Sequence, residues 1–215
     1  MNQTARRFLV ASGAALALTL AACDAPVGGI HAVERDGPMD GPTVVFFHGA
    51  AFTSDVWVET GILDAVSGAG FRAIAVDLPG AGRSPGTTDP APVWFQGLLE
   101  ERSIDCPILV APSASGRVLE EVLSVPNPVD RFGLCGVVVV APVTRELPGV
   151  GVPALVVWGS DDRVVPMSNA TPLAESLQTD DLVVIQGGGH AVYQTDTDAF
   201  ISVLLEWLAD LSVAA

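Results

Sequence analysis

Side chains that could react together follow several apolar runs of this sequence. Ser113 comes after the run "CPILVAP", the pair Asp161 and Asp162 follows "ALVVWG", and His190 follows "DLVVIQGGG". An acid can orient a histidine, the histidine can take the proton of a serine hydroxyl, and the serine can then attack an acyl carbon. These residue types therefore favour nucleophilic hydrolysis of an ester or a related acyl compound.

The nucleophile has two candidates, Ser113 and Ser115, in the stretch "LVAPSASGRVL", which lacks the usual G-x-S-x-G pattern. A nucleophile at a tight strand-to-helix turn needs small residues two positions before and after it, because the helix packs closely on the strand. Ser113 has Ala111 and Ser115 at these positions, whereas Ser115 has the large Arg117. The sequence thus favours Ser113. The alternative is that Ser113 only caps the helix that follows.

The base is expected to be His190, since it follows the last predicted strand. It would take the serine proton and later activate water. Two other histidines exist. His31 lies in an N-terminal segment, and His48 ends an early strand, where we expect a structural turn residue.

Stabilisation of the developing negative charge needs two backbone N–H groups. One is expected from Ala114, directly after the nucleophile. The other is expected from the loop after "FFHG", at Ala50, with Ala51 as the alternative.

Buried strands alternate with helical segments along the chain, which predicts an α/β fold with a mostly parallel sheet covered on both faces. The expected strands are 43–49, 71–80, 106–112, 136–142, 152–162 and 181–190, and the expected helices are 55–70, 93–103, 115–125, 166–177 and 196–211. Functional residues gather at the carboxyl ends of such strands. Apolar residues there that could line a pocket, or simply belong to the core, are Phe52, Trp57, Val143 and Val192.

The N-terminus has the pattern of an export signal. Residues 1–22 contain two arginines and then a short apolar run, and "LAAC" resembles the lipobox of bacterial lipoproteins, in which Cys23 is lipidated. The alternative is an uncleaved membrane anchor. We expect 23–42 to be a tether with one short strand near 30–34, and 43–215 to be the folded domain. The protein would be exported and held at the membrane only by its lipid.

The charge argues against a nucleic-acid partner. The 215 residues contain no lysine and carry a formal net charge of −15, and loss of residues 1–22 would make it −17. Phosphate binding needs a basic patch. No motif calls for a cofactor, and no histidine accompanies Cys106 and Cys135 to suggest a metal site. We expect a monomer with a small-molecule substrate.

The motifs together resemble the α/β-hydrolase superfamily over nearly all of 43–211. They are "FFHGAAFTSDVW", "AIAVDLPGAGRS", "APSASG", "WGSDDRVVP" and "GGGHAVY". In detail they are similar to the small α/β-hydrolase domain-containing protein 14 group. The resemblance implies a triad of Ser113, His190 and Asp162, because "GSDDRVVP" is similar to a G-x-x-D-R-x-x-P turn in which the Asp before Arg orients the histidine. Asp161 remains the alternative.

The resemblance also implies a compact fold acting on small acyl esters. A lysine-deacetylase activity that uses coenzyme A is associated with the group, but an exported protein meets no coenzyme A pool, so water is the expected acceptor. About ten residues separate the fourth and fifth strands, which leaves no room for a cap domain and predicts an open site.

The same fold would make the strands that follow Cys106 and Cys135 neighbours, with both cysteines at the end away from the active site. Either a disulfide or two buried thiols would fit.

Three functional hypotheses follow. The first is an exported, lipid-anchored serine hydrolase. The second is a catalytically inactive hydrolase fold that serves as a binding protein. The third keeps the fold and changes the chemistry to a cofactor-free haloperoxidase or a C–C-bond hydrolase, which fold similarity alone cannot separate from the first.

Overall fold

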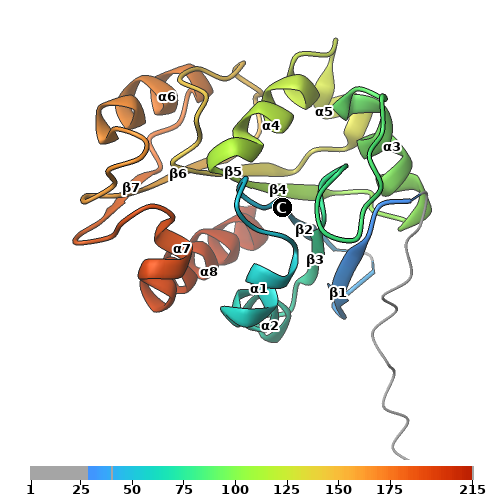
Figure 1. Cartoon of the computed structure of the whole chain (residues 1–215), viewed down its shortest axis with the longest axis horizontal. Coiled ribbons are helices and arrows are strands. Elements are labelled where there is room, and N and C mark those ends of the chain that lie inside the picture. Colours follow the sequence, from blue (N-terminus) through green and yellow to red (C-terminus); the bar gives the residue numbers. More distant parts are fainter. Residues whose placement is uncertain (1–28, 40, 215) are drawn as a thin grey trace, which may run out of the picture.

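A seven-stranded sheet runs through the centre of the computed structural model, which describes residues 29–39 and 41–214 (Figure 1). The strands, in chain order, are β1 (Ala32–Arg35), β2 (Thr43–Phe46), β3 (Arg72–Val76), β4 (Pro107–Pro112), β5 (Gly136–Val140), β6 (Ala154–Gly159) and β7 (Leu182–Ile185). Their order in the sheet is β1-β3-β2-β4-β5-β6-β7. All neighbouring pairs are parallel except β1 with β3.

The sheet is mostly parallel because its strands are apolar on both faces. Every residue of β4 and β5 is buried, and β5 has the sequence "GVVVV". β-branched side chains suit a pleated strand, and helices must cover both faces of such a strand to exclude water.

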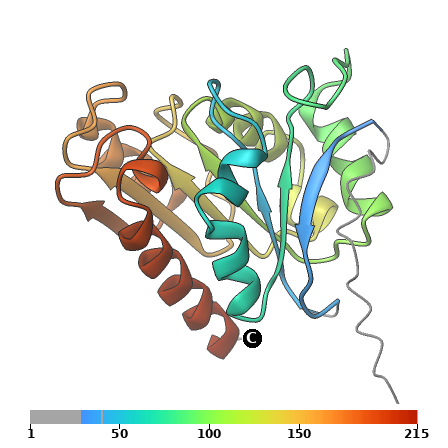
Figure 2. The same cartoon turned by 60° about the horizontal axis from the view of Figure 1, so that its bottom comes forward.

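Two layers of helices provide this cover. The helices are α1 (Asp55–Glu59), α2 (Ile62–Gly68), α3 (Ala91–Glu101), α4 (Gly116–Leu123), α5 (Pro128–Phe132), α6 (Ala170–Leu177), α7 (Val192–Thr195) and α8 (Thr197–Ala214). α3 to α6 lie on one face, and α1, α2, α7 and α8 lie on the other (Figure 1). Figure 2 shows the long α8 beside α2 on the second face. The predicted α/β fold is confirmed.

The helical segments differ from the prediction in three places. The single helix expected over 55–70 is wrong, since Gly61, at a φ of +73°, separates α1 from α2. Glycine adopts this backbone conformation at little cost. α5 and α7 were not expected, because four or five residues are too few to show a helical period.

The N-terminal part of the described chain belongs to the sheet. β1 lies inside the range 23–42 that the sequence assigns to a tether, and it pairs with β3 as an antiparallel edge strand. His31, just before it, is only 3% exposed. The predicted signal, residues 1–22, and Cys23 lie outside the described residues. No helix within 29–39 or 41–214 is long and apolar enough to cross a membrane.

The connection from β5 to β6 has no helix and no cap. Residues 141–153 contain neither helix nor strand, although the two strands are parallel. Leu147 and Val150 of this segment are buried in the core beneath α4 and α6, where a crossover helix would otherwise pack. Leu147 N–H also donates to Ser176 Oγ in α6, over 3.2 Å. The expected absence of a cap domain is confirmed over this segment.

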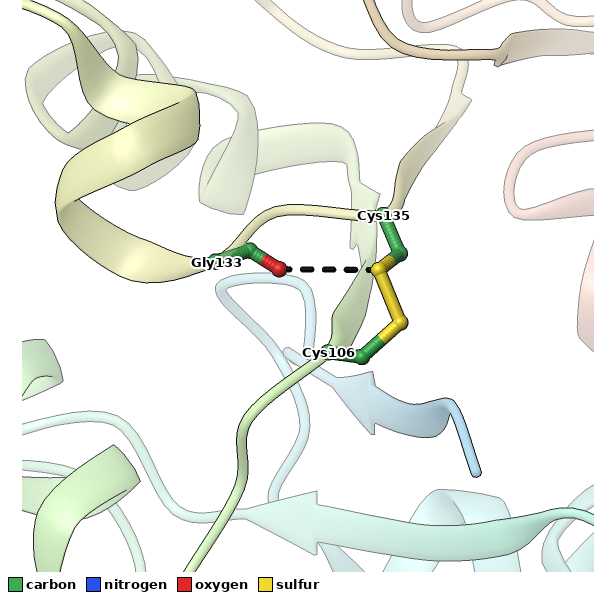
Figure 3. The surroundings of a disulfide bond; sticks show 3 residues. All are labelled: Cys106, Gly133 and Cys135. Atoms are coloured by element: carbon green, nitrogen blue, oxygen red, sulfur yellow. Dashed lines mark hydrogen bonds between the residues drawn. A yellow bond between two sulfur atoms is a disulfide. The ribbon is translucent and has the colours of Figure 1, made fainter. Parts of the chain in front are cut away.

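A disulfide joins Cys106 and Cys135, which precede the neighbouring strands β4 and β5 (Figure 3). Their Cα atoms are 5.3 Å apart, within the usual range for a disulfide. The Gly133 carbonyl oxygen lies 3.6 Å from Cys135 Sγ, a contact with no shared proton, because a disulfide sulfur carries none. The bond lies at the amino ends of the strands, opposite the edge where the predicted site residues lie.

Replacing both cysteines with serine should lower stability without lowering activity. The bond joins positions 29 residues apart, and a loop of that size corresponds to about 3 to 4 kcal/mol of unfolding free energy. Denaturant unfolding of the wild type and of Cys106→Ser/Cys135→Ser, each with and without reductant, measures this. The variant should be insensitive to the reductant, and the idea fails if the reductant also leaves the wild-type unfolding midpoint unchanged.

Candidate active site

Ser113 occupies a strained turn between β4 and α4. Its φ is +49°, a left-handed conformation that is uncommon for a residue with a side chain. A short 3₁₀ helix, Ser113–Ser115, leads from this turn into α4. Ser115 is fully buried, and its Oγ donates to Pro112 O over 2.7 Å, while Val143 N–H donates to Ser113 O over 3.0 Å. These contacts hold Ser113 in its unfavourable backbone conformation at the end of the strand.

The close packing expected of such a turn is present without the flanking glycines. Ala111 and Ser115, two positions before and after Ser113, are both fully buried. The glycine requirement is instead met at Gly116, where a Cβ would lie only 2.6 Å from Pro142 Cβ. A larger residue there would push α4 away from the segment after β5.

The structure brings Ser113, His190 and Asp162 together in one hydrogen-bonded chain. His190 Nε2 lies 2.9 Å from Ser113 Oγ, and His190 Nδ1 lies 2.8 Å from Asp162 Oδ2. A carboxylate can only accept, so Nδ1–H donates to Asp162 and Nε2 is left to accept from the serine hydroxyl. The His190 side chain is 14% exposed and that of Asp162 is 0% exposed. This arrangement can remove a proton from Ser113 when it attacks.

Asp162 and Asp161 have different surroundings although they are adjacent in the chain. Asp162 Oδ1 accepts from Val164 N–H and from Val165 N–H, each over 2.8 Å, so both carboxylate oxygens are bonded. Asp161 is exposed, and within the described residues its side chain has one hydrogen bond, which it accepts from Ser160 Oγ. The geometry therefore places Asp162, and not Asp161, on His190.

Glycines allow the His190 loop to lie against the end of β6. A Cβ on Gly159 would be 2.3 Å from Gly188 O, and one on Gly188 would be 2.7 Å from Val192 Cγ2. Asp161 N–H donates to Gly188 O over 2.9 Å, and Gly187 N–H donates to Ser160 Oγ over 2.8 Å. The loop that carries the acid and the loop that carries the histidine are thus held together by one hydrogen bond between backbone groups and one from the backbone to a side chain.

The turn after β2 lies beside Ser113, as the oxyanion hypothesis requires. A Cβ on Gly49 would be 3.6 Å from Ser113 Cβ. Leu78 N–H donates to His48 Nε2 over 2.9 Å, so His48 Nδ1 carries the ring proton and donates to Gly49 O, also over 2.9 Å. In a trans peptide the Gly49 C=O and the Ala50 N–H point in opposite directions. His48 therefore fixes the direction of the Ala50 N–H, which is a structural role.

The loop after β3 supports this turn from the other side. Asp77 is fully buried, and its carboxylate accepts from Ser54 N–H and from Arg83 N–H, each over 2.7 Å. Burial alone would raise the pKa of Asp77, but these hydrogen bonds, with a smaller contribution from His31, hold it below its usual value. Stability from a depressed carboxyl pKa is present above the pKa of the unfolded chain and is lost as the pH falls through the folded value.

The four apolar residues that the sequence offered as pocket or core residues divide into two pairs. Trp57 and Val192 are core residues, 0% and 1% exposed. Phe52 is half-buried, with a side-chain carbon near Gly49, and Val143 is 37% exposed beside Ser113. Only Phe52 and Val143 are therefore placed to meet a substrate.

One residue near the site received no role from the sequence. Tyr193 lies three positions after His190 and is fully buried, and its Oη lies 3.5 Å from the point where Gly49 would carry a Cβ. The only sequence signal was its place in the motif "GGGHAVY". An isolated tyrosine after an apolar pair usually indicates core packing.

The chain is similar to known hydrolases. A family model described as alpha/beta hydrolase fold matches residues 42–102. The chain is 30% identical over 183 residues to "Putative protein-lysine deacylase ABHD14B" of Pongo abelii, covering 79% of this chain and 84% of that protein. It is 32% identical over 179 residues to "Protein ABHD14A" of Rattus norvegicus, covering 78% and 72%.

A solved structure is similar in fold. The crystal structure of a predicted CIB-like hydrolase from Thermoplasma acidophilum superposes with a TM-score of 0.75 at 24% identity, covering 86% of this chain and 95% of that chain. At this identity the likeness concerns the fold alone.

The two adjacent aspartates offer a matched pair of variants. Asp162→Asn should lower kcat about 1,000-fold to 10,000-fold, because an amide can no longer hold His190 in the required tautomer. Asp161→Asn should stay within about twofold of the wild type, because its carboxylate is exposed. Steady-state ester hydrolysis measures both. Equal losses in the two variants, or a larger loss in Asp161→Asn, would contradict the assignment of Asp162.

Proposed function

The chain belongs to the α/β-hydrolase family, with the ABHD14 proteins among its relatives, and we propose that this hydrolase is a serine esterase that uses Ser113, His190 and Asp162. The proposed substrates are small esters or related acyl compounds. One observation carries the proposal, namely the continuous hydrogen-bonded chain from Ser113 Oγ through His190 to Asp162, with links of 2.9 and 2.8 Å.

The first half-reaction forms an acyl-enzyme. Ser113 Oγ attacks the acyl carbon while its proton moves to His190 Nε2, and the negative charge of Asp162 stabilises the imidazolium. The carbonyl oxygen becomes negative and accepts from the N–H groups of Ala50 and Ala114. The bond to the leaving alcohol then breaks, and His190 returns the proton to the alcohol oxygen.

The second half-reaction releases the acid. Water enters in place of the alcohol, gives a proton to His190 Nε2 and attacks the acyl carbon. The bond to Ser113 Oγ breaks, and the proton returns to the serine. Each proton taken from a nucleophile is given back to a leaving group, so no further co-reactant is needed.

The open surroundings of Ser113 favour small or surface-presented acyl groups. Residues 141–153 form no cap, and the exposed Val143, Val164 and Met167 follow β5 and β6 around the site. The relatives named as putative lysine deacylases suggest an acyl-lysine side chain as a second substrate class. An amide has a poorer leaving group than an ester, so ester hydrolysis is expected to be faster.

Labelling with a fluorophosphonate tests the nucleophile. The probe should form an adduct on Ser113 in the folded protein, located by mass spectrometry, and Ser113→Ala should abolish it. Ser124→Ala serves as the control and should keep the full label, since Ser124 is an exposed serine at the end of α4 whose hydroxyl donates locally, to Glu120 O. An unlabelled wild type that is folded by circular dichroism would remove the hydrolase mechanism and favour the inactive binding protein.

We also propose that the protein is exported and lipidated at Cys23. The "LAAC" sequence before Asp24 supports lipidation. The Cys106–Cys135 disulfide also supports export, because such bonds persist in oxidising compartments and are rare in the cytosol.

Lipidation has a direct test in a bacterial host. The full chain, grown with an alkyne-tagged palmitate, should take up the tag and fractionate with membranes. Cys23→Ala should lose the tag, because that thiol is the proposed acceptor. Tag retained in Cys23→Ala, or absent from the wild type, would refute the anchor while leaving the proposed catalytic site untouched.

A further inference from the structure

The hydroxyl of Tyr193 has no hydrogen-bond partner of normal geometry within the described residues, although it is fully buried. Buried polar groups in folded proteins are almost always paired, and an unpaired one weakens the fold. Phenylalanine would make the same ring contacts without this cost. Folding stability therefore does not account for the hydroxyl.

The ring of Tyr193 is held rigidly. It stacks on Trp57 with ring centroids 4.5 Å apart and an interplanar angle of 25°, and it packs edge-on against Phe52 at 6.3 Å. The ring of Phe200 in α8 also lies near the Tyr193 ring, with ring centroids 6.2 Å apart. A phenol fixed in this way has little freedom to turn its oxygen toward another partner.

The oxygen lies at the junction of the loops that carry the proposed chemistry. A Cβ on Gly49 would be 3.5 Å from Tyr193 Oη and 3.6 Å from Ser113 Cβ. Tyr193 itself belongs to α7, which begins directly after His190 and Ala191. One side chain therefore links the histidine loop to the turn that precedes the Ala50 N–H.

The backbone of Gly49 interacts with this oxygen. Burial raises the pKa of the Tyr193 phenol, and the Gly49 N–H acts in the opposite direction, so the group is a neutral phenol whose oxygen faces that N–H. The opposite side of Gly49 is held by His48, which donates to Gly49 O. Polar side chains thus face both the N–H and the C=O of the residue before Ala50.

We propose that Tyr193 is a positioning residue for the oxyanion turn, and that its hydroxyl keeps the Gly49–Ala50 peptide aimed at the oxygen of an acyl group on Ser113. This inference rests on the proposed serine hydrolase function. The hydroxyl acts through Gly49 and not on the substrate, since it is buried. Hydrogen bonds of this kind are often long in a free enzyme and shorten as charge develops.

Tyr193→Phe separates positioning from packing, because it removes only the oxygen. We expect kcat for a small ester to fall about 10-fold to 100-fold, with little change in KM, because a misaligned turn weakens transition-state binding. The melting temperature should stay close to that of the wild type, because the described part of the fold loses no hydrogen bond of normal geometry with this hydroxyl. The pH profile of kcat/KM should keep its shape, because His190 is not altered.

Thr179→Val is the matched control, since it also removes one hydroxyl. Thr179 Oγ1 donates to Ala154 O over 2.6 Å at the amino end of β6, away from the proposed site. This variant should therefore lose stability and keep kcat. Wild-type kcat in Tyr193→Phe would overturn the positioning role, and so would a loss of kcat that accompanies a lower melting temperature. Absence of both fluorophosphonate labelling and ester hydrolysis in the wild type would instead overturn the proposed function itself.

Discussion

The left-handed backbone of Ser113 is the constraint on which the rest of the candidate site depends. At a φ of +49° the chain reverses sharply from β4 into α4 and projects the serine from the end of the sheet. This conformation is unfavourable for a residue with a Cβ and persists only where the surroundings enforce it. Here the enforcement comes from the Ser115 hydroxyl, from Val143 N–H and from the close contact of Gly116 with Pro142.

The parallel sheet brings the partners of Ser113 to the same edge. β2 and β5 lie on either side of β4, so the turn at Gly49 lies beside the serine and Val143 N–H donates to its carbonyl oxygen. β6 and β7 supply the acid and the histidine from further along the sheet. Their loops reach back because Gly159 and Gly188 allow the two backbones to approach closely. The site is therefore made of short loops on a rigid frame, which suits the small geometric tolerance of nucleophilic catalysis.

The short connection between β5 and β6 also shapes the molecule. The segment between β5 and β6 replaces a crossover helix with a loop whose Leu147 and Val150 complete the core. This short connection carries no cap over the carboxyl ends of the strands. A disulfide at the opposite edge joins the strands β4 and β5 on which this arrangement rests.

The sequence by itself determined the elements and the types of residue at their ends. Six strands, the both-sided burial of the sheet and the choice of Ser113 over Ser115 followed from patterns within a dozen residues, since burial and helix–strand contact leave local traces. β1 was suggested near 30–34, but its antiparallel place beside β3 was not, because strand pairing joins residues distant in the chain.

Only the tertiary structure decided which neighbours meet. Asp161 and Asp162 are chemically identical and adjacent, and the Val164 and Val165 N–H groups and His190 distinguish them only once the loops are folded. The pairing of Cys106 with Cys135 depended in the same way on two strands being neighbours. The position of the Tyr193 hydroxyl beside Gly49 had no local signal, because a buried tyrosine has the same sequence pattern whether its oxygen faces the core or a backbone turn.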